Sequence, residues 1–356
     1  MRLFFIFHYS LSVYSLIYCT MPVKSRCSWA SVCFGVQTVS LVLFFYTFSI
    51  TLTFYNKKFI TMFRFPLSIT IFHLFIKFLL ALLCRTIWEL KTGKERILLS
   101  WDLYVRKVAP TGISSSLDIG LSNWSFEYIT VSLYTMTKST SIVFILGFSL
   151  LFGLEKKMWS LIFVVMFIAA GLFMFTYQST QFNLEGFLLV LTASLLSGIR
   201  WTLAQMLTQK KEIGLSNPLD MIYHVQPWMI LALLPLSVYF EGKTLFGAED
   251  LHVVLKNFGL LLIGALLAFM LEISEYLLVS FTSGLTLCIA GIFKEICTLA
   301  LAAEINGDRM TLLNFLGLVV CLAGIALHVV LKAHSSKNRL FSERFSVFMR
   351  VDDCRL

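Results

Sequence analysis

Charged residues are scarce in this chain, and their scarcity excludes most soluble folds. Only 14% of the 356 residues are charged, whereas 58% are hydrophobic and 15% are aromatic. Soluble domains carry about 25% charged residues. Runs of about twenty apolar residues, each long enough to cross roughly 30 Å of hydrocarbon, recur along almost the whole chain. We therefore expect an all-α polytopic membrane protein without a soluble module.

The chain also lacks the short motifs that are typical of membrane-bound enzymes. It contains no His-Glu-x-x-His, no P-loop and no Gly-x-Ser-x-Gly. Its eight cysteines are scattered, and none forms a Cys-x-x-Cys pair or a Cys/His cluster with the spacing of metal ligands. We read them as packing residues. The prediction is a protein that is not an enzyme and has no catalytic residue, metal site or cofactor.

Hydropathy predicts ten spans separated by short polar turns. They run over residues 34–54, 66–84, 108–126, 131–152, 159–177, 186–208, 221–240, 258–279, 285–303 and 313–331. Residues 333–356 form a basic tail. Residues 1–33 are an extension of open status, because a signal peptide, an eleventh helix and a segment upstream of an internal start at Met21 all fit the first twenty residues.

The net charge of +9 resides in the connections and the tail, which suits an orientation signal rather than nucleic-acid binding. Lysine and arginine are most frequent between the second and third spans, from Arg85 to Lys107, and after the last span. Both regions should face the cytosol. An even number of spans then places both termini in the cytosol.

Two lysines stand inside apolar spans, where a charge is costly unless it faces protein or a water-filled cavity. Lys138 lies in the fourth span and Lys294 in the ninth, and each stretch starts with a small residue followed by leucine before it reaches the lysine. An offset of five helices favours a five-plus-five inverted repeat, with halves at 34–177 and 178–332. The lysines would then face one another across a central cavity, joined by an anionic phosphate.

Hydroxyl groups surround Lys138 in the sequence, among them Ser139. They could bind a ligand, or they could bond back to their own helix carbonyls. Asn123, in an Asn-Trp-Ser sequence, formally matches a glycosylation acceptor, but the turn after it is short, and we expect it to bond across helices. Tyr134 and Tyr223 could offer aromatic faces to a base or sugar, or pack as interface anchors.

The stretches FYNKKFI, LSNWSFEYITVSLYTMTKS, SGIRWTLAQMLTQK and SGLTLCIAGIFKE resemble motifs of the nucleotide-sugar and triose-phosphate translocators of the drug/metabolite transporter superfamily. The resemblance covers about residues 34–332. Two further fragments, GLFMFTYQSTQFNLEGF and YHVQP, are similar to the GDP-fucose-transporter-like members of the nucleotide-sugar carriers' C subfamily. Glu295 stands where the phosphate translocators have an arginine, and YHVQP keeps only Tyr223 of the motif of GDP-sugar carriers.

The resemblance implies exchange of a nucleotide sugar, GDP-fucose first, for a nucleoside monophosphate across a Golgi or ER–Golgi intermediate membrane. Two alternatives stay open, a non-transporting regulator of another carrier and a carrier of a different phosphorylated metabolite. Expected partners are these nucleotides, membrane lipid and, as an open alternative, a second copy of the chain, but no nucleic acid. The expected substrate-binding residues are Lys138, Lys294, Tyr134, Ser139, Asn123, Tyr223 and Glu295.

Overall fold

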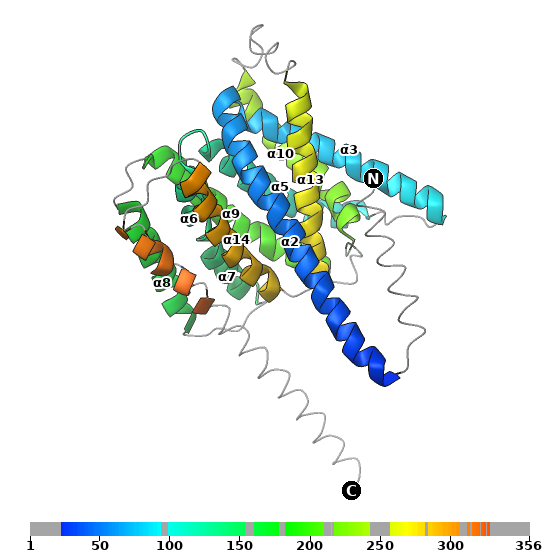
Figure 1. Ribbon diagram of the computed structural model, residues 1–356. Coiled ribbons are helices and arrows are strands. Elements are labelled where there is room, and N and C mark those ends of the chain that lie inside the picture. Colours follow the sequence, from blue (N-terminus) through cyan, green and yellow to red (C-terminus); the bar gives the residue numbers. More distant parts are fainter. Residues whose placement is uncertain are drawn as a thin grey trace.

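The structure, a computed structural model, describes residues 23–93, 99–153, 160–177, 182–209, 215, 217–242, 257–281 and 284–305, and short stretches between 312 and 327. Every regular element named in these ranges is a helix. They are α2 (Val23–Phe63), α3 (Pro66–Thr92), α4 (Trp101–Leu103), the π-helical η1 (Tyr104–Val108), α5 (Ala109–Ser125), α6 (Val131–Lys138), α7 (Ser141–Leu151), α8 (Ser160–Tyr177), α9 (Leu184–Gln209), α10 (Pro218–Phe240), α13 (Phe258–Phe281) and α14 (Gly284–Ile305). Figure 1 shows them packed into one bundle.

Six helical segments in the described ranges are long and apolar enough to cross a membrane. They are Val39–Phe63, Pro66–Thr92, Val131–Leu151, Leu184–Leu207, Pro218–Phe240 and Phe258–Leu278. The protein is therefore a polytopic helical membrane protein. The count of ten spans and the inverted repeat remain predictions, and the tail at 333–356 and the first 22 residues lie outside the described residues.

The second predicted span ends at the wrong place. Helix α3 continues beyond residue 84 to Thr92, because no glycine or proline interrupts it before Gly93. Gly93 has a φ of 63°, and its N–H binds the carbonyl of Glu89 at 2.8 Å. A left-handed glycine in this position is a common helix terminator. Arg85, which the sequence placed in a cytosolic connection, is thus part of the helix.

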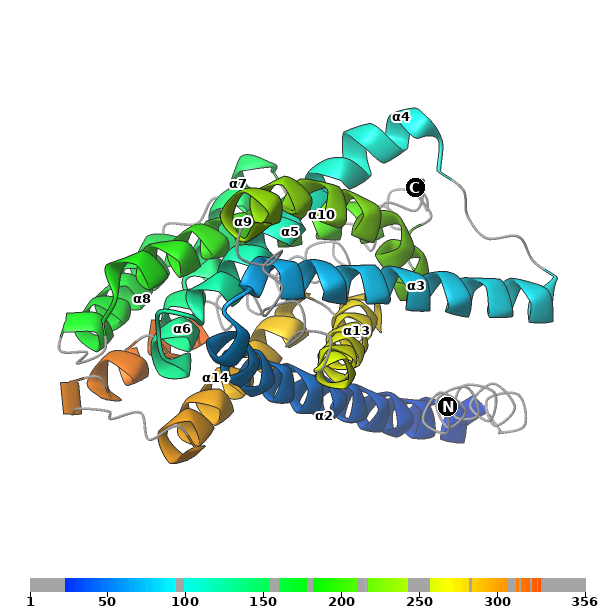
Figure 2. The same cartoon turned by 90° about the horizontal axis from the view of Figure 1, so that it is seen from above.

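The helices of the two predicted halves interlock rather than forming separate bodies. Helix α10 packs against α3 and α5, α9 packs against α5 and α7, and α14 packs against α6. Helix α13 contacts both α2 and α3, and the view from above shows it between them (Figure 2). One hydrophobic core, which includes Leu74, Met229 and Phe269, joins α3, α10 and α13. Residues distant in sequence therefore meet inside the bundle.

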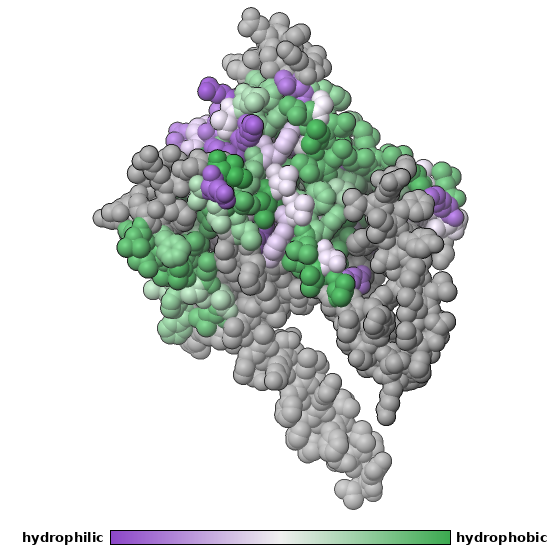
Figure 3. Space-filling model, in the orientation of Figure 1, coloured by the Kyte–Doolittle hydropathy of each residue, from purple (hydrophilic) through white to green (hydrophobic). Residues whose placement is uncertain are grey.

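Large apolar side chains also cover the outside of the bundle. Leu231 is 62% exposed, and Phe163 and Phe173 are exposed to a similar degree. Much of the coloured surface in Figure 3 is hydrophobic, and hydrophilic residues gather mainly near its upper end. An apolar belt of this kind suits lipid contact, so the polar groups inside the bundle require a separate explanation.

Candidate functional site

The fourth predicted span is interrupted in its middle, immediately after Lys138. Helix α6 ends at Lys138, Ser139 and Thr140 form a turn, and α7 begins at Ser141. In this turn the N–H of Thr140 binds the carbonyl of Thr137, three residues earlier, at 3.1 Å. In a regular α-helix it would bind the carbonyl four residues earlier. Irregular backbone at membrane depth occurs where it is buried in protein or lines a cavity, and transporters place binding sites there.

Lys138 is bound by two side chains of α5. Its ammonium group forms a hydrogen-bonded ion pair with Asp118 and donates to the hydroxyl of Ser122 at 2.9 Å. Asp118 and Ser122 are four residues apart, so both lie on one face of α5. The side chain of Asp118 is only 3% exposed, and that of Lys138 is 22% exposed. The charge of Lys138 is therefore compensated inside the protein.

Asp118 also binds a second cation. The Nη1 atom of Arg200, on α9, lies 3.3 Å from Oδ2 of Asp118, and Nη2 lies 3.6 Å from Glu275 on α13. Tyr276 forms a side-chain hydrogen bond with the same guanidinium. Arg200 thus serves as an ion-pair partner, and it connects α5 with α9 and α13.

Lys294 and Glu295 add another pair of opposite charges from α14. Lys294 is close enough to Lys138 and to Glu275 for charge interactions, and its ammonium group lies 5.9 Å from the ring centroid of Phe45. Glu295 lies beside Ser139. Its oxygen Oε2 is buried without a hydrogen-bond partner among the described residues.

We call Lys138, Arg200, Lys294, Asp118, Glu275 and Glu295 the central charge cluster. With every group ionised, its three cations and three anions cancel. Carboxylates therefore balance the charges of the two lysines even when no anion is bound. The sequence missed Ser122 and the pairing of Asp118, although the four-residue spacing of these two could have indicated a shared face.

The other predicted site residues divide between this cluster and distant positions. Tyr134 forms a side-chain hydrogen bond with Ser122, and its ring lies 4.3 Å from that of Phe126. The hydroxyl of Ser139 donates to the carbonyl of Thr135 at 3.0 Å, one of the two roles open for it. Both residues border the central charge cluster.

Asn123 bonds across helices, as predicted. Its amide donates to Thr70 on α3 at 2.8 Å and accepts from Asn56 on α2 at 3.1 Å. The neighbouring Lys57 donates to the carbonyls of Phe126 and Ile129, both at 2.7 Å. Two of the stretches quoted above, FYNKKFI and LSNWSFEYITVSLYTMTKS, thus meet at the turn that precedes α6 and position the helix that carries Lys138.

Tyr223 lies in a second polar cluster, between α3 and α10. Arg85 stacks over its ring at 4.2 Å and forms an ion pair with Asp220 at 3.3 Å. Another nitrogen of Arg85 lies 3.4 Å from His224. Arg85 is therefore not an exposed residue of a connection, because its side chain is only 7% exposed and an acidic partner lies on α10.

A third buried pair ties α3 to α13. Lys77 donates to Glu272 at 2.7 Å, and Gln226 of α10 donates to the same carboxylate oxygen at 2.8 Å. All three residues are buried. Such pairs hold helices together and leave few intramembrane charges without a partner. In the ranges that the structure describes, no three His, Cys, Asp or Glu residues gather as metal ligands.

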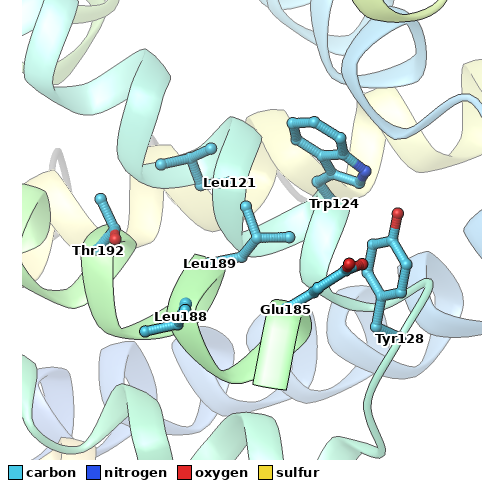
Figure 4. A pocket seen from close by; sticks show the side chains of 7 residues that line it. All are labelled: Leu121, Trp124, Tyr128, Glu185, Leu188, Leu189 and Thr192. Carbon is cyan, nitrogen blue, oxygen red and sulfur yellow. The ribbon is translucent and has the colours of Figure 1, made fainter. Parts of the chain in front are cut away.

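A cavity of about 380 Å³ lies between α5 and α9, away from the central charge cluster. Its walls are Leu121, Trp124, Tyr128, Glu185, Leu188, Leu189 and Thr192 (Figure 4). None of the residues predicted to bind substrate lines it. A phosphate site at Lys138 therefore rests on the cluster and the broken helix, not on this cavity.

Comparisons of the sequence with known proteins all point to one family of transporters. Residues 36–329 match the model of the Triose-phosphate Transporter family. A protein of Arabidopsis thaliana named "Probable sugar phosphate/phosphate translocator At1g06470" is 33% identical over 300 residues, covering 82% of this chain and 72% of that protein. A second Arabidopsis protein, named "Probable sugar phosphate/phosphate translocator At1g53660", is 27% identical over 308 residues, or 85% of this chain and 89% of its own length.

A yeast protein and a solved structure extend the comparison. YMD8 of Saccharomyces cerevisiae, whose name proposes nucleotide-sugar transport, is 27% identical over 295 residues, covering 64% of this chain and 67% of its own length. A solved structure described as "Crystal structure of protein" superposes with a TM-score of 0.52 at 10% identity, covering 82% of this chain and 96% of that one. At that identity the likeness concerns the fold alone.

Proposed function

Because this chain belongs to the Triose-phosphate Transporter family, and so to a family of membrane transporters, we propose that it exchanges phosphorylated metabolites and binds their phosphate at Lys138 and Lys294. The observation that carries the proposal is the break in the fourth span directly after Lys138, where α6 packs against α14. This two-residue turn, whose backbone keeps right-handed helical dihedrals, puts a partly buried ammonium group at the junction of two helices within one predicted span.

The charge balance of the cluster supports exchange rather than free passage. A phosphate that binds Lys138 takes the place of the Asp118 carboxylate, which keeps Arg200 as its partner. When the ligand leaves, Asp118 returns to Lys138, so neither state leaves an isolated charge. Lysine suits such a cycle, because its ammonium is a point charge that releases an anion more readily than a bidentate arginine does.

Among phosphorylated metabolites, we favour a nucleotide sugar, GDP-fucose first, in exchange for a nucleoside monophosphate. Glu295 beside Lys294 lowers the local positive charge, which disfavours a compact dianion such as a triose phosphate. Its buried, unpartnered oxygen could accept hydrogen bonds from a larger polar ligand. The C-subfamily fragments and the name of YMD8 point the same way.

Sugar phosphates are the second candidate, because the names of both Arabidopsis relatives describe sugar phosphate/phosphate translocators. A non-transporting regulator fits less well, since Lys138 and Lys294 are both present and balanced by carboxylates.

We propose a Golgi or ER–Golgi intermediate membrane, with both termini in the cytosol, from the resemblance to nucleotide-sugar carriers and from the charge of the connections. Tyr223 and Asn123 stay proposed substrate contacts, reached only if the helices rearrange.

The test is counterflow with purified protein in liposomes. Liposomes preloaded with GMP, UMP or inorganic phosphate receive labelled GDP-fucose, a UDP-sugar or a triose phosphate outside. We expect GDP-fucose uptake only with GMP inside. Exchange of triose phosphate for inorganic phosphate, with no nucleotide-sugar uptake, would establish the second candidate. No exchange of any substrate, by protein that is folded and correctly inserted, would reject transport.

A further inference from the structure

The cavity between α5 and α9 is polar at one end and apolar at the other. Figure 4 shows Trp124, Tyr128 and Glu185 together on one side, while the leucines of its wall lie beyond them toward Thr192. This division matches the two parts of a lipid molecule, a polar headgroup and a hydrocarbon chain.

The polar end coincides with the ends of the two helices. Tyr128 lies in the turn after α5, and Glu185 lies in the first turn of α9. Thr192 is seven residues farther along α9, which is about 10 Å deeper at 1.5 Å per residue. Span ends lie at the membrane interface, so the polar end is at headgroup level. Leu188 is 50% exposed, so this part of the wall also lies at the apolar outer surface of the bundle.

The walls of the polar end are held by close packing. A Cβ atom on Gly186 would lie 2.8 Å from Cβ of Tyr128 and 2.5 Å from a methyl carbon of Ile129, so only glycine allows this approach. The ring of Trp124 packs at 4.9 Å against that of Phe240 on α10. The two aromatic side chains thus have fixed positions beside the carboxylate of Glu185.

We propose that this cavity is a binding site for a phospholipid with a choline headgroup. Aromatic faces attract a methylated ammonium ion, and a nearby carboxylate compensates its charge. Glu185 would repel the net negative charge of an anionic lipid. The apolar walls formed by Leu121, Leu188 and Leu189 accommodate the start of an acyl chain.

Retention of lipid by the purified protein tests the site. The protein is incubated in detergent with equal amounts of phosphatidylcholine, phosphatidylethanolamine and phosphatidylglycerol, and bound lipid is counted by native mass spectrometry. We expect phosphatidylcholine to be retained above the other two. Glu185→Gln and Trp124→Leu should each lower its retention about five-fold. The control is Glu304→Gln, which changes an exposed carboxylate near the end of α14 and should leave retention unchanged.

Equal retention of phosphatidylcholine by the native protein and by Glu185→Gln would overturn the proposal. Preference for phosphatidylglycerol, or retention of phosphatidylethanolamine as strong as that of phosphatidylcholine, would overturn it as well. Glu185 is exposed, so its conservative replacement tests the site even if the Trp124 variant fails to fold. The readout is lipid binding and does not depend on the transported substrate.

Discussion

Asp118 and Lys138 form an ion pair in the interior of the bundle, between α5 and the end of α6. Asp118 also binds Arg200, so its carboxylate joins two cations from different helices. Breaking a buried pair is costly because the remaining charge is left in a medium of low polarity. The pair therefore stabilises the carrier when no anion occupies Lys138.

Asp118→Asn should destabilise the substrate-free protein by about 3 kcal/mol, because it leaves Lys138 without its counter-ion. Thermal unfolding in detergent measures the change, and addition of the transported phosphate should restore more stability to the variant than to the native protein. Asp102→Asn is the control, since its pair with Arg106 is more than 70% exposed and should matter by less than about 0.5 kcal/mol. Equal melting of both variants would contradict the assigned role of Asp118.

Lys138→Ala and Lys294→Ala should each reduce exchange at least about tenfold, since each removes a charge-assisted contact to phosphate. Lys→Arg at either position should also impair exchange, because a guanidinium binds phosphate with different geometry. Initial rates of counterflow measure both effects. Lys91→Ala, at the exposed end of α3, should behave as the native protein. Normal rates in Lys294→Ala would remove that residue from the site.

Lys57→Met should lower the free energy of unfolding by about 2 kcal/mol, because two carbonyls after α5 lose a charged donor. Lys58→Met alters the adjacent, exposed lysine and should change stability by less than about 0.5 kcal/mol. Melting temperatures of the two variants, purified side by side, make the comparison. A similar loss in both would mean that the motif acts through its overall charge.

Gly198→Ala should destabilise the protein by about 1–3 kcal/mol, because the new Cβ would lie 2.7 Å from Cβ and 2.8 Å from the backbone carbonyl carbon of Phe144. Gly147→Ala, on α7, places its Cβ in open space and should be neutral or slightly stabilising. Unfolding in detergent distinguishes the two. Unchanged stability in Gly198→Ala would show that α7 and α9 can separate freely.

Sequence reasoning located most of the helices, because apolar length and polar turns determine membrane spans directly. It also predicted the cross-helix role of Asn123, since an intramembrane polar group must find a partner. It did not predict the break after Lys138. The sequence Lys-Ser-Thr-Ser is compatible with a continuous helix, and it does not show that α6 contacts α14 as well as α9, whereas α7 packs on α9.

Two other features depended on information that a single sequence does not carry. The acceptors of Lys57 are backbone carbonyls, which every residue possesses, so no residue type indicates them. The partner of Arg85 is Asp220, on a helix far along the chain, and neither residue shows the pairing by its local pattern. Burial of Arg85 could be recognised only once α3 and α10 were known to be neighbours.

The turn at Ser139 and Thr140 gives the fourth span a joint. Helix α7 packs on α9, whereas α6 contacts both α9 and α14. A shift of α14 relative to α9 can therefore tilt α6 while α7 stays in place, and the bend is absorbed by these two residues. Lys138 is the last residue before this turn, so such a shift would reorient its ammonium group. Helix movement would thereby change the affinity of Lys138 for an anion.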